Sequence, residues 1–295
     1  MSRVLKRLPS RLGRLILVGL PYGWLLAFLL APFLIVFKIS LSETRQGIPP
    51  YLPLWQDDGV HLNWANYGFL VSDPLYVEAL VSSLQVATVS TLVCLLIGYP
   101  MAYGIARAPR RLRTPLLMMV VLPFWTSLLL RVYAWIGLLR TEGPVNQALI
   151  ALGLIDEPLQ LLYTPFALHL GIVYSYLPFM ILPLYATLER LDGSLLEAAA
   201  DLGCRPFRAF LLVTLPLSLP GIIAGSLLVF IPAVGEFVIP DLLGGPDSLM
   251  IGSVLWSEFF SNRDWPVASA VAVVLLVLLV APIAALQRAQ RDEAS

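Results

Sequence analysis

The sequence predicts an all-α polytopic membrane protein with six transmembrane helices. Hydrophobic residues make up 58% of the 295 residues and charged residues only 13%. The mean hydropathy is +0.82, and these values together exclude an ordinary soluble domain. Apolar stretches of about 20 residues can cross a hydrocarbon core of about 30 Å as helices. Six such stretches follow one another along the chain: Leu15–Phe37, Ala79–Ile105, Pro115–Leu139, Pro165–Leu188, Ser218–Pro240 and Pro266–Leu286.

The first span follows a basic segment, residues 1–14, as the apolar part of a secretory signal would. Its apolar run is long enough to cross the membrane, and no small-residue cleavage site follows it. We therefore expect an uncleaved first helix.

Positive charges are distributed unevenly among the links between the spans. Basic residues gather in the N-terminal segment, beside the link between the second and third spans, and after the fourth and sixth spans. The opposite links, 38–78, 140–164 and 241–265, hold only Lys38, Arg45, Arg140 and Arg263. By the positive-inside rule, the N-terminal residues 1–14 and the C-terminal tail 289–295 are both expected in the cytoplasm. The net charge is zero, so no bulk field indicates nucleic acid as a partner.

The first outward link, residues 39–78, is the longest, and it is rich in proline and aromatic residues. We expect it to form a small capping structure outside the membrane. Prolines also occur within the spans, where each one frees a backbone carbonyl that a neighbour or a wet cavity must satisfy. A single proline of this kind may mark only irregular helix packing, but their clustering in the fourth and fifth spans favours a transport pathway there. The prolines within the spans are Pro21 and Pro32 in the first, Pro123 in the third, Pro178 and Pro183 in the fourth, and Pro232 in the fifth.

The segment 191–216, between the fourth and fifth spans, predicts two short helices joined by a turn. Ser194 and Glu197 have the spacing of a capping box, so a helix should begin near Leu195. Gly203 can adopt the left-handed conformation that ends a helix, and Pro206 suits the first turn of a second helix. By its pattern alone, the segment could be an amphipathic connector at the membrane surface.

This segment resembles the cytoplasmic loop of binding-protein-dependent ABC importer permeases of type I. The resemblance rests on Glu197-Ala198-Ala199, on Gly203 and on Leu215-Pro216. It implies the type I permease fold, with a permease domain over residues 15–288 and a coupling loop over 191–216 that docks its first helix on an ATP-hydrolysing subunit. The residues assigned to this coupling by the resemblance are Glu197, Ala198, Ala199, Asp201, Gly203 and Pro206.

The resemblance continues outside the coupling loop and is closest to polyamine permeases of the putrescine type. It is carried by Leu122–Trp125, Arg131–Trp135, Leu217–Gly221 and Ala233–Gly245. One departure is Cys204, where the family more often has alanine. The resemblance implies a bacterial inner-membrane permease that works with a dimer of cytoplasmic ATP-binding subunits, a second homologous permease subunit and a periplasmic or extracellular polyamine-binding protein.

No nucleotide-binding motif is visible in the sequence. A P-loop needs a lysine after a glycine-rich turn, and the two lysines, Lys6 and Lys38, do not follow one. We therefore expect that the chain is not an enzyme, binds no cofactor, and leaves ATP and Mg to the partner ATPase.

Two charged residues, Arg131 and Glu236, fall within predicted spans, where each is costly unless paired or hydrated. Counted along straight helices, they lie about 24 Å and 28 Å from the cytoplasmic face. One alternative is that they neutralise each other. Alternatively, Glu236 faces a cavity and meets an ammonium group of the substrate.

A flexible dication would need further carboxylates for its ends and aromatic faces for its stem. Many of the aromatic residues near the spans can instead anchor helices at the membrane interface. The candidate path residues besides Glu236 are Asp241, Trp125, Tyr133, Trp135 and Tyr174, with Glu258, Tyr176 and Trp256 as further members of the same chemical set.

Three other classes of function receive little support from the sequence. An ion-driven secondary transporter would share the kinked helices and buried charges, but it gives no reason for the 191–216 segment. An intramembrane protease would need Ser175 to pair with His169, six residues away and not on the same helical face. His61 and His169 are too isolated for a metal site, and Cys94 and Cys204 are expected to be packing residues.

Overall fold

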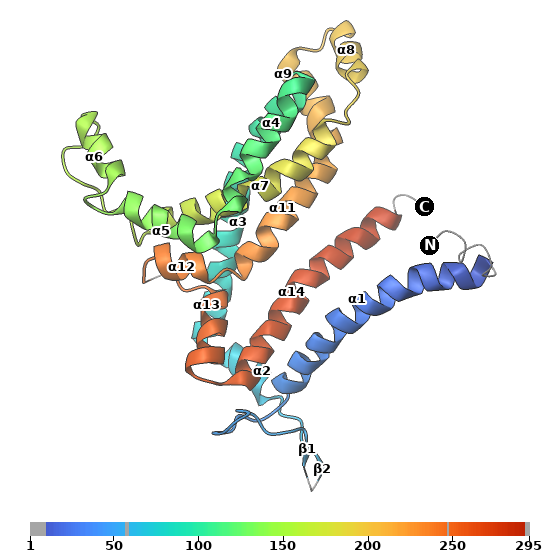
Figure 1. The fold of residues 1–295 in the computed structure, drawn as a ribbon, viewed down its shortest axis with the longest axis vertical. Coiled ribbons are helices and arrows are strands. Elements are labelled where there is room, and N and C mark those ends of the chain that lie inside the picture. Colours follow the sequence, from blue (N-terminus) through green and yellow to red (C-terminus); the bar gives the residue numbers. More distant parts are fainter. Residues whose placement is uncertain (1–9, 57–58, 247, 293–295) are drawn as a thin grey trace. The chain divides into compact units, whose positions relative to one another are not determined.

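The computed structural model describes residues 10–56, 59–246 and 248–292, and these are mostly helical (Figure 1). The chain separates into two compact units. Unit 1 joins the residues up to Pro74 to those from Leu255 onward, and unit 2 comprises Leu75–Val254.

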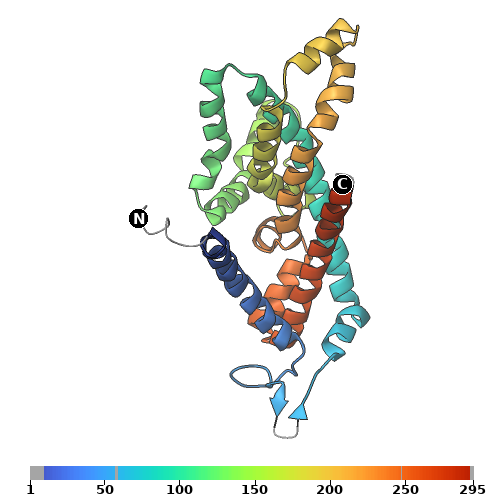
Figure 2. The same cartoon turned by 90° about the vertical axis from the view of Figure 1, so that its right-hand side faces the viewer.

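Unit 1 pairs the first and last long helices. Its elements are α1 (Ser10–Ser40), β1 (Trp55–Gln56), β2 (Gly59–Val60), α2 (Ala65–Ser72), the π-helical turn η4 (Ser257–Ser261) and α14 (Trp265–Asp292). The helices α1 and α14 pack together and converge toward the β1–β2 hairpin (Figure 2).

The 39–78 link contains this hairpin and α2, and its place outside the membrane remains a prediction. The amide nitrogen Nδ2 of Asn66 holds the link against the end of α1 by donating to the carbonyls of Ser40 and Ser42, both at 2.9 Å. Thr44 donates to Asp264 at 2.8 Å, which connects the link to the chain just before α14.

Unit 2 contains the remaining helices. They are α3 (Pro74–Arg107), α4 (Arg110–Val121), the 3₁₀ turn η2 (Leu122–Trp125), α5 (Leu128–Leu139), α6 (Pro144–Ala151), α7 (Pro165–Leu188), α8 (Ser194–Asp201), α9 (Pro206–Ala209), the π-helical turn η3 (Phe210–Thr214), α10 (Leu215–Leu217), α11 (Leu219–Val234), α12 (Val238–Leu243) and α13 (Ile251–Trp256).

The core of unit 2 is built on close packing between α7 and α11. A Cβ atom on Gly225 would lie 2.9 Å from the Met180 sulfur and 3.0 Å from the Met180 carbonyl oxygen. Gly221 meets α7 equally closely at Thr187 and Pro183. Small residues let two apolar helices approach at backbone distance, which is the usual way in which membrane helices associate.

Among the described residues, three helical stretches are long and apolar enough to cross a membrane: Leu17–Ser40, Pro74–Arg107 and Pro165–Leu188. The number rises to five if each of two bent helix pairs counts as one span. The predicted last span falls in α14, in which Trp265–Val280 is an apolar stretch of the described side chains. The total of six spans and the side of the termini remain predictions, and the terminal segments lie partly outside the described residues.

The predicted span Pro115–Leu139 is not one straight helix but is broken near Pro123. The stretch Arg110–Trp125 meets Leu128–Ala151 at an angle of 89°. Thr126 and Ser127 between them have extended backbone, with ψ of 150° and 142°. The 3₁₀ turn ahead of the break contains Pro123, which cannot donate a backbone hydrogen bond.

The fifth span, predicted as Ser218–Pro240, is also interrupted. Helix α11 ends at Val234 and α12 begins at Val238. Glu236 lies in the break itself. The straight-helix depths calculated for Arg131 and Glu236 therefore do not hold, because a helical rise cannot be counted through a bend.

Candidate functional site

Helix α8 begins one residue earlier than predicted, and it begins by a different device. Ser194 is the first helical residue and Gly193 takes the N-cap position, so the predicted capping box is wrong. Instead, Oδ1 of Asp192 accepts a hydrogen bond from the Ser194 backbone N–H at 3.0 Å. This bond lowers the pKa of the exposed Asp192 carboxyl below its usual value. The aspartate two residues upstream thus satisfies an N–H that the capping box was expected to serve.

The end of α8 agrees with the prediction. Gly203 has a φ of +76°. Its N–H donates to the carbonyl of Ala200 at 2.8 Å, and the next N–H, of Cys204, donates to the carbonyl of Ala199 at 2.9 Å. These two bonds define a Schellman motif, which closes the helix and reverses the chain.

The second helix begins at Pro206, as predicted, and then widens into the π-helical turn Phe210–Thr214, which the sequence analysis missed. Turns of this kind often occur at functional sites. Phe210 meets the rings of Tyr99 and Tyr103 on α3 edge-on, at centroid distances of 5.6 Å and 6.1 Å. No short-range sequence signal identifies this contact, because more than 100 residues separate its partners.

A buried hydrogen bond joins α3 to the start of α11. The hydroxyl groups of Tyr99 and Ser218 lie 2.8 Å apart, and Ser218 also donates to the carbonyl of Leu215. The turn after α9 is therefore held by α3 through two aromatic contacts and one hydrogen bond.

Several large apolar side chains of the 191–216 segment are exposed in this chain. Leu202, Phe207 and Leu212 are 89%, 72% and 71% exposed. Of the six residues assigned to coupling, Ala199 is buried, whereas Glu197, Ala198, Asp201, Gly203 and Pro206 are exposed. The structure thus places these residues together on one short helix–turn–helix element at the end of unit 2 (Figure 1).

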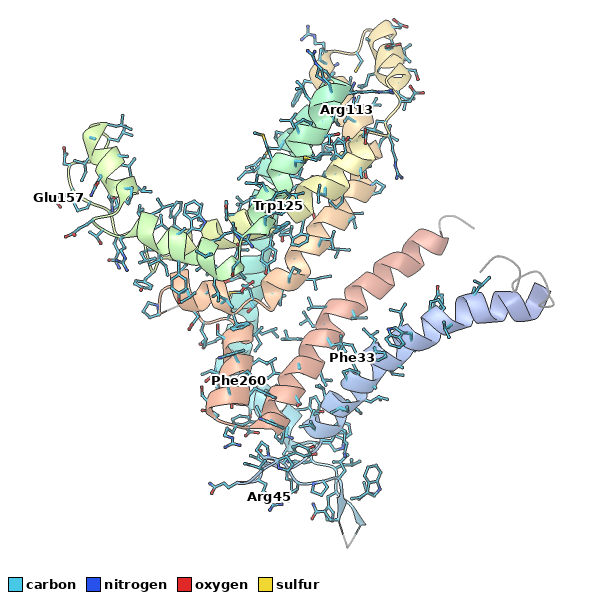
Figure 3. All side chains as sticks on the ribbon, viewed as in Figure 1. Phe33, Arg45, Arg113, Trp125, Glu157 and Phe260 are labelled. Atoms are coloured by element: carbon cyan, nitrogen blue, oxygen red, sulfur yellow. The ribbon has the colours of Figure 1, made fainter. Side chains whose placement is uncertain are left out.

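Nearby, Arg113 of α4 forms an ion pair with Glu189 at the end of α7, at 3.1 Å (Figure 3). This pair connects two helices at the same end of unit 2. Both side chains are partly exposed, so its contribution to stability is small, about 0–1 kcal/mol.

Glu236 is buried, and both oxygens of its carboxylate are hydrogen-bonded. Tyr176 of α7 donates its hydroxyl to Oε2. The backbone N–H groups of Val238 and Ile239 donate to Oε1 at 3.1 Å and 3.4 Å. Glu236 therefore compensates the first free N–H groups of α12, and it is joined to α7 across the break.

Arg131 forms no ion pair with Glu236 in the described structure. Its Nε and Nη1 atoms are buried and have no hydrogen-bond partner there. The guanidinium carbon lies 5.6 Å from the centroid of the Phe124 ring, in a cation–π contact. Phe124 in turn packs against Phe179 at 5.0 Å. These two phenylalanines belong to the surroundings of the intramembrane charge, and the sequence analysis did not single them out.

The predicted aromatic residues of the path are brought together only in part. Trp135 and Tyr174 meet edge-on at 5.4 Å. Trp125, in the turn before the break, is 83% exposed, and Tyr133 is 59% exposed (Figure 3). Asp241 is exposed on α12 and lines a cavity of about 540 Å³. The contacts of these residues with a substrate remain predictions.

The proposed serine–histidine pair of an intramembrane enzyme is absent from the described structure. Nδ1 of His169 lies 2.9 Å from the hydroxyl of Ser90, not from that of Ser175. Within the described part of the chain, no group of three or more histidine, cysteine or acidic side chains is placed to hold a metal ion.

The broken spans, the buried intramembrane charge and the exposed helix–turn–helix element define the chain as a polytopic helical membrane protein. The chain belongs to the family described as "Binding-protein-dependent transport system inner membrane component", which matches residues 14–291. The predicted resemblance to the permeases of binding-protein-dependent importers, and the predicted inner-membrane location, are thereby confirmed.

Curated relatives cover nearly the whole chain. The chain is 43% identical to "Spermidine/putrescine transport system permease protein PotB" of Haemophilus influenzae, over 94% of this chain and 93% of the relative. It is 40% identical to the protein of the same name from Escherichia coli K12, over 91% of this chain and 94% of the relative.

The fold is shared with a solved importer. A chain of a bacterial ABC transporter involved in the import of the acidic polysaccharide alginate has a TM-score of 0.66 at 19% identity. The match covers 97% of this chain and 98% of that one. The predicted importer-permease fold is confirmed at this level.

Proposed function

We propose that this chain is the permease subunit of an ATP-binding-cassette importer that carries a polyamine, putrescine first among them, across the inner membrane by alternating access. Full-length similarity to permeases named for spermidine and putrescine supports the substrate class. The observation that carries the mechanism is the helix–turn–helix of residues 191–216, which we call the coupling element, because its exposed large apolar side chains form a surface suited to packing against another protein.

In this proposal a cytoplasmic ATPase binds the exposed face of α8, which carries Glu197, Ala198 and Asp201. The ATPase also contacts the turn at Gly203 and Pro206. Closure of two ATPase subunits around ATP and Mg moves α8, and the contacts of Phe210 pass the motion to α3. This chain supplies no catalytic residue and binds no cofactor. By the positive-inside rule, residues 1–14 and 289–295 lie in the cytoplasm.

The path for the substrate runs along the α7–α11 core and the two broken helices. Glu236 is the carboxylate nearest the break, but in the described state its oxygens are occupied by Tyr176 and α12. For Glu236 to meet an ammonium group, the hydroxyl of Tyr176 must first move away. Trp135 and Tyr174 provide ring faces, and Trp125, Tyr133 and Asp241 lie at exposed positions along the path.

A second homologous permease subunit and a periplasmic polyamine-binding protein complete the proposed complex. A related solved transporter was determined with an alginate pentasaccharide-bound periplasmic protein, and its chain has a TM-score of 0.67 with this one at 19% identity. The likeness supports the architecture of the partners and not the choice of substrate.

The test is reconstitution of the complete complex in proteoliposomes, with ATP hydrolysis and uptake measured together. We expect binding protein loaded with putrescine or spermidine to stimulate ATP hydrolysis and to drive uptake that stops on ATP depletion. Uptake that follows a proton gradient and ignores ATP depletion would replace the importer with a secondary transporter. Absence of stimulation by either polyamine would refute the substrate class and leave the family assignment intact.

A further inference from the structure

One cavity of unit 2 lies away from the coupling element. It has a volume of about 540 Å³, and its polar lining comprises Gln160, Tyr163, Asp241, Ser248 and Ser253. We call it the Asp241 cavity. It is formed by α12, by residues 244–246, 248 and 249 after it, by Ser253 of α13 and by the chain just before α7, and Figure 1 shows α12 well away from α8. Sites for small molecules commonly have volumes of about 300–1,000 Å³.

The charge of the described lining is negative. Asp241 is its one charged side chain, and no lysine or arginine contributes to it. The Asp241 carboxylate is exposed, and within the described part of the chain it takes part in no hydrogen bond or ion pair. This differs from Glu236, whose two oxygens are both engaged. The Asp241 carboxylate is therefore free to accept a cation without first breaking an internal contact.

The walls of the cavity are fixed by close backbone packing. A Cβ atom on Gly245 would lie 2.6 Å from the Tyr163 carbonyl oxygen, so the two walls touch there. A Cβ atom on Gly244 would lie 2.5 Å from the Pro240 carbonyl oxygen. The Gly245 N–H also donates to the Ser248 hydroxyl at 3.1 Å. A site held in this way loses little entropy when a ligand enters.

The segment that carries Gln160 and Tyr163 is anchored separately. The side chain of Asn146, which is 1% exposed, bonds both backbone groups of Leu159. It donates to the Leu159 carbonyl at 2.8 Å and accepts from the Leu159 N–H at 3.0 Å. This pair of hydrogen bonds to the residue before Gln160 fixes the position from which Gln160 and Tyr163 extend into the lining.

These features select one chemical class of ligand. A carboxylate with neighbouring hydroxyl and amide oxygens satisfies the N–H groups of an ammonium ion. The ring of Tyr163 offers a π face to a cation or to the methylene groups beside it. An anion would meet the uncompensated charge of Asp241 and be repelled.

We propose that the Asp241 cavity is a binding site for an organic ammonium ion, in which Asp241 pairs with a primary amine and Tyr163 contacts the adjoining methylene groups. The proposal rests on the proposed import of polyamines, and it adds a place where the permease itself holds the substrate apart from Glu236. An amine held here leaves the rest of a diamine exposed for transfer to the next carboxylate.

The test uses the complete reconstituted complex and a putrescine analogue that carries a photoreactive diazirine. In wild type, irradiation should label peptides containing Tyr163 or Leu249, and unlabelled putrescine should suppress this labelling whereas succinate should not. Asp241→Asn keeps the shape and removes the charge, and it should reduce the labelling about tenfold, as expected for loss of a charge-assisted contact. Glu157→Gln, which neutralises a carboxylate outside the cavity (Figure 3), should leave the labelling unchanged.

A second variant covers the case in which Asp241→Asn does not assemble. Tyr163→Asn removes the ring but tolerates the φ of 60° at this position, and it should lower the labelling several-fold. Normal uptake with labelling that neither variant changes would overturn the cavity site alone. A wild-type complex that takes up no polyamine would overturn the proposed function, whichever residues are labelled.

Discussion

The turn at Gly203 gives the sharpest test of the coupling element. Its φ of +76° lies in the left-handed region, where a residue with a side chain loses about 1–2 kcal/mol. A Cβ atom at this position would meet nothing within 4 Å. Gly203→Ala therefore adds only backbone strain and no steric clash. This strain destabilises the Schellman motif that ends α8.

A free energy of this size shifts the balance between the closed and frayed ends of α8 by about 5- to 30-fold. We expect Gly203→Ala to reduce ATP hydrolysis stimulated by the loaded binding protein by up to that factor in proteoliposomes. Capture of the ATPase subunit by the purified permease should fall with it. Gly203→Asn should lose less, because asparagine tolerates the left-handed region.

The control is Gly193→Ala at the other end of the same helix. Gly193 has a φ of −59°, and its Cβ would also be free of contacts. Alanine should therefore be tolerated there without loss of coupling. Wild-type coupling in Gly203→Ala, or an equal loss in both variants, would refute the assignment of the Gly203 turn.

Two further predictions concern the core of unit 2. Tyr176→Phe removes a hydroxyl donated to a buried carboxylate and should lower the free energy of unfolding by about 1–3 kcal/mol, measured by thermal unfolding of the purified chain in detergent. Tyr174→Phe, whose ring contact with Trp135 survives, should change it little, and equal effects would contradict the bond. Gly225→Ala forces α7 and α11 apart and should cost about 1–3 kcal/mol in the same assay. Gly104→Ala, where a Cβ meets nothing within 4 Å, is the control, and an unchanged unfolding temperature in Gly225→Ala would contradict the close packing.

The coupling element was predictable from the sequence because its signals are local. Gly203 and Pro206 act through their own backbone, so their roles can be identified without knowing the rest of the fold. The capping-box prediction was wrong because a second local signal competes with it. Two local devices compete for the N–H groups at the start of α8, and Asp192 accepts the bond from the Ser194 N–H that the Glu197 side chain was expected to accept.

The surroundings of the intramembrane charges were not predictable. Arg131 and Glu236 seemed suited to pair because each was placed by counting along a straight helix. The break at Thr126 and Ser127 changes the direction of α5. The break at Gly235 lets the Glu236 carboxylate accept hydrogen bonds from the first N–H groups of α12. Which partner a buried charge finds depends on these bends, and hydropathy does not resolve them.

By itself, the sequence determined that this chain is an α-helical membrane permease, where its apolar helices lie and which short segment carries the family pattern. These properties follow from composition, from hydropathy over about 20 residues and from turn chemistry within a few residues. Only the tertiary structure decided that Tyr176 donates a hydrogen bond to Glu236 and that Tyr99 of α3 packs against Phe210. It also decided that Gln160, Tyr163 and Asp241 line one cavity. Contacts between residues so far apart in the chain depend on helix packing and on the angles of two breaks, which no local pattern specifies.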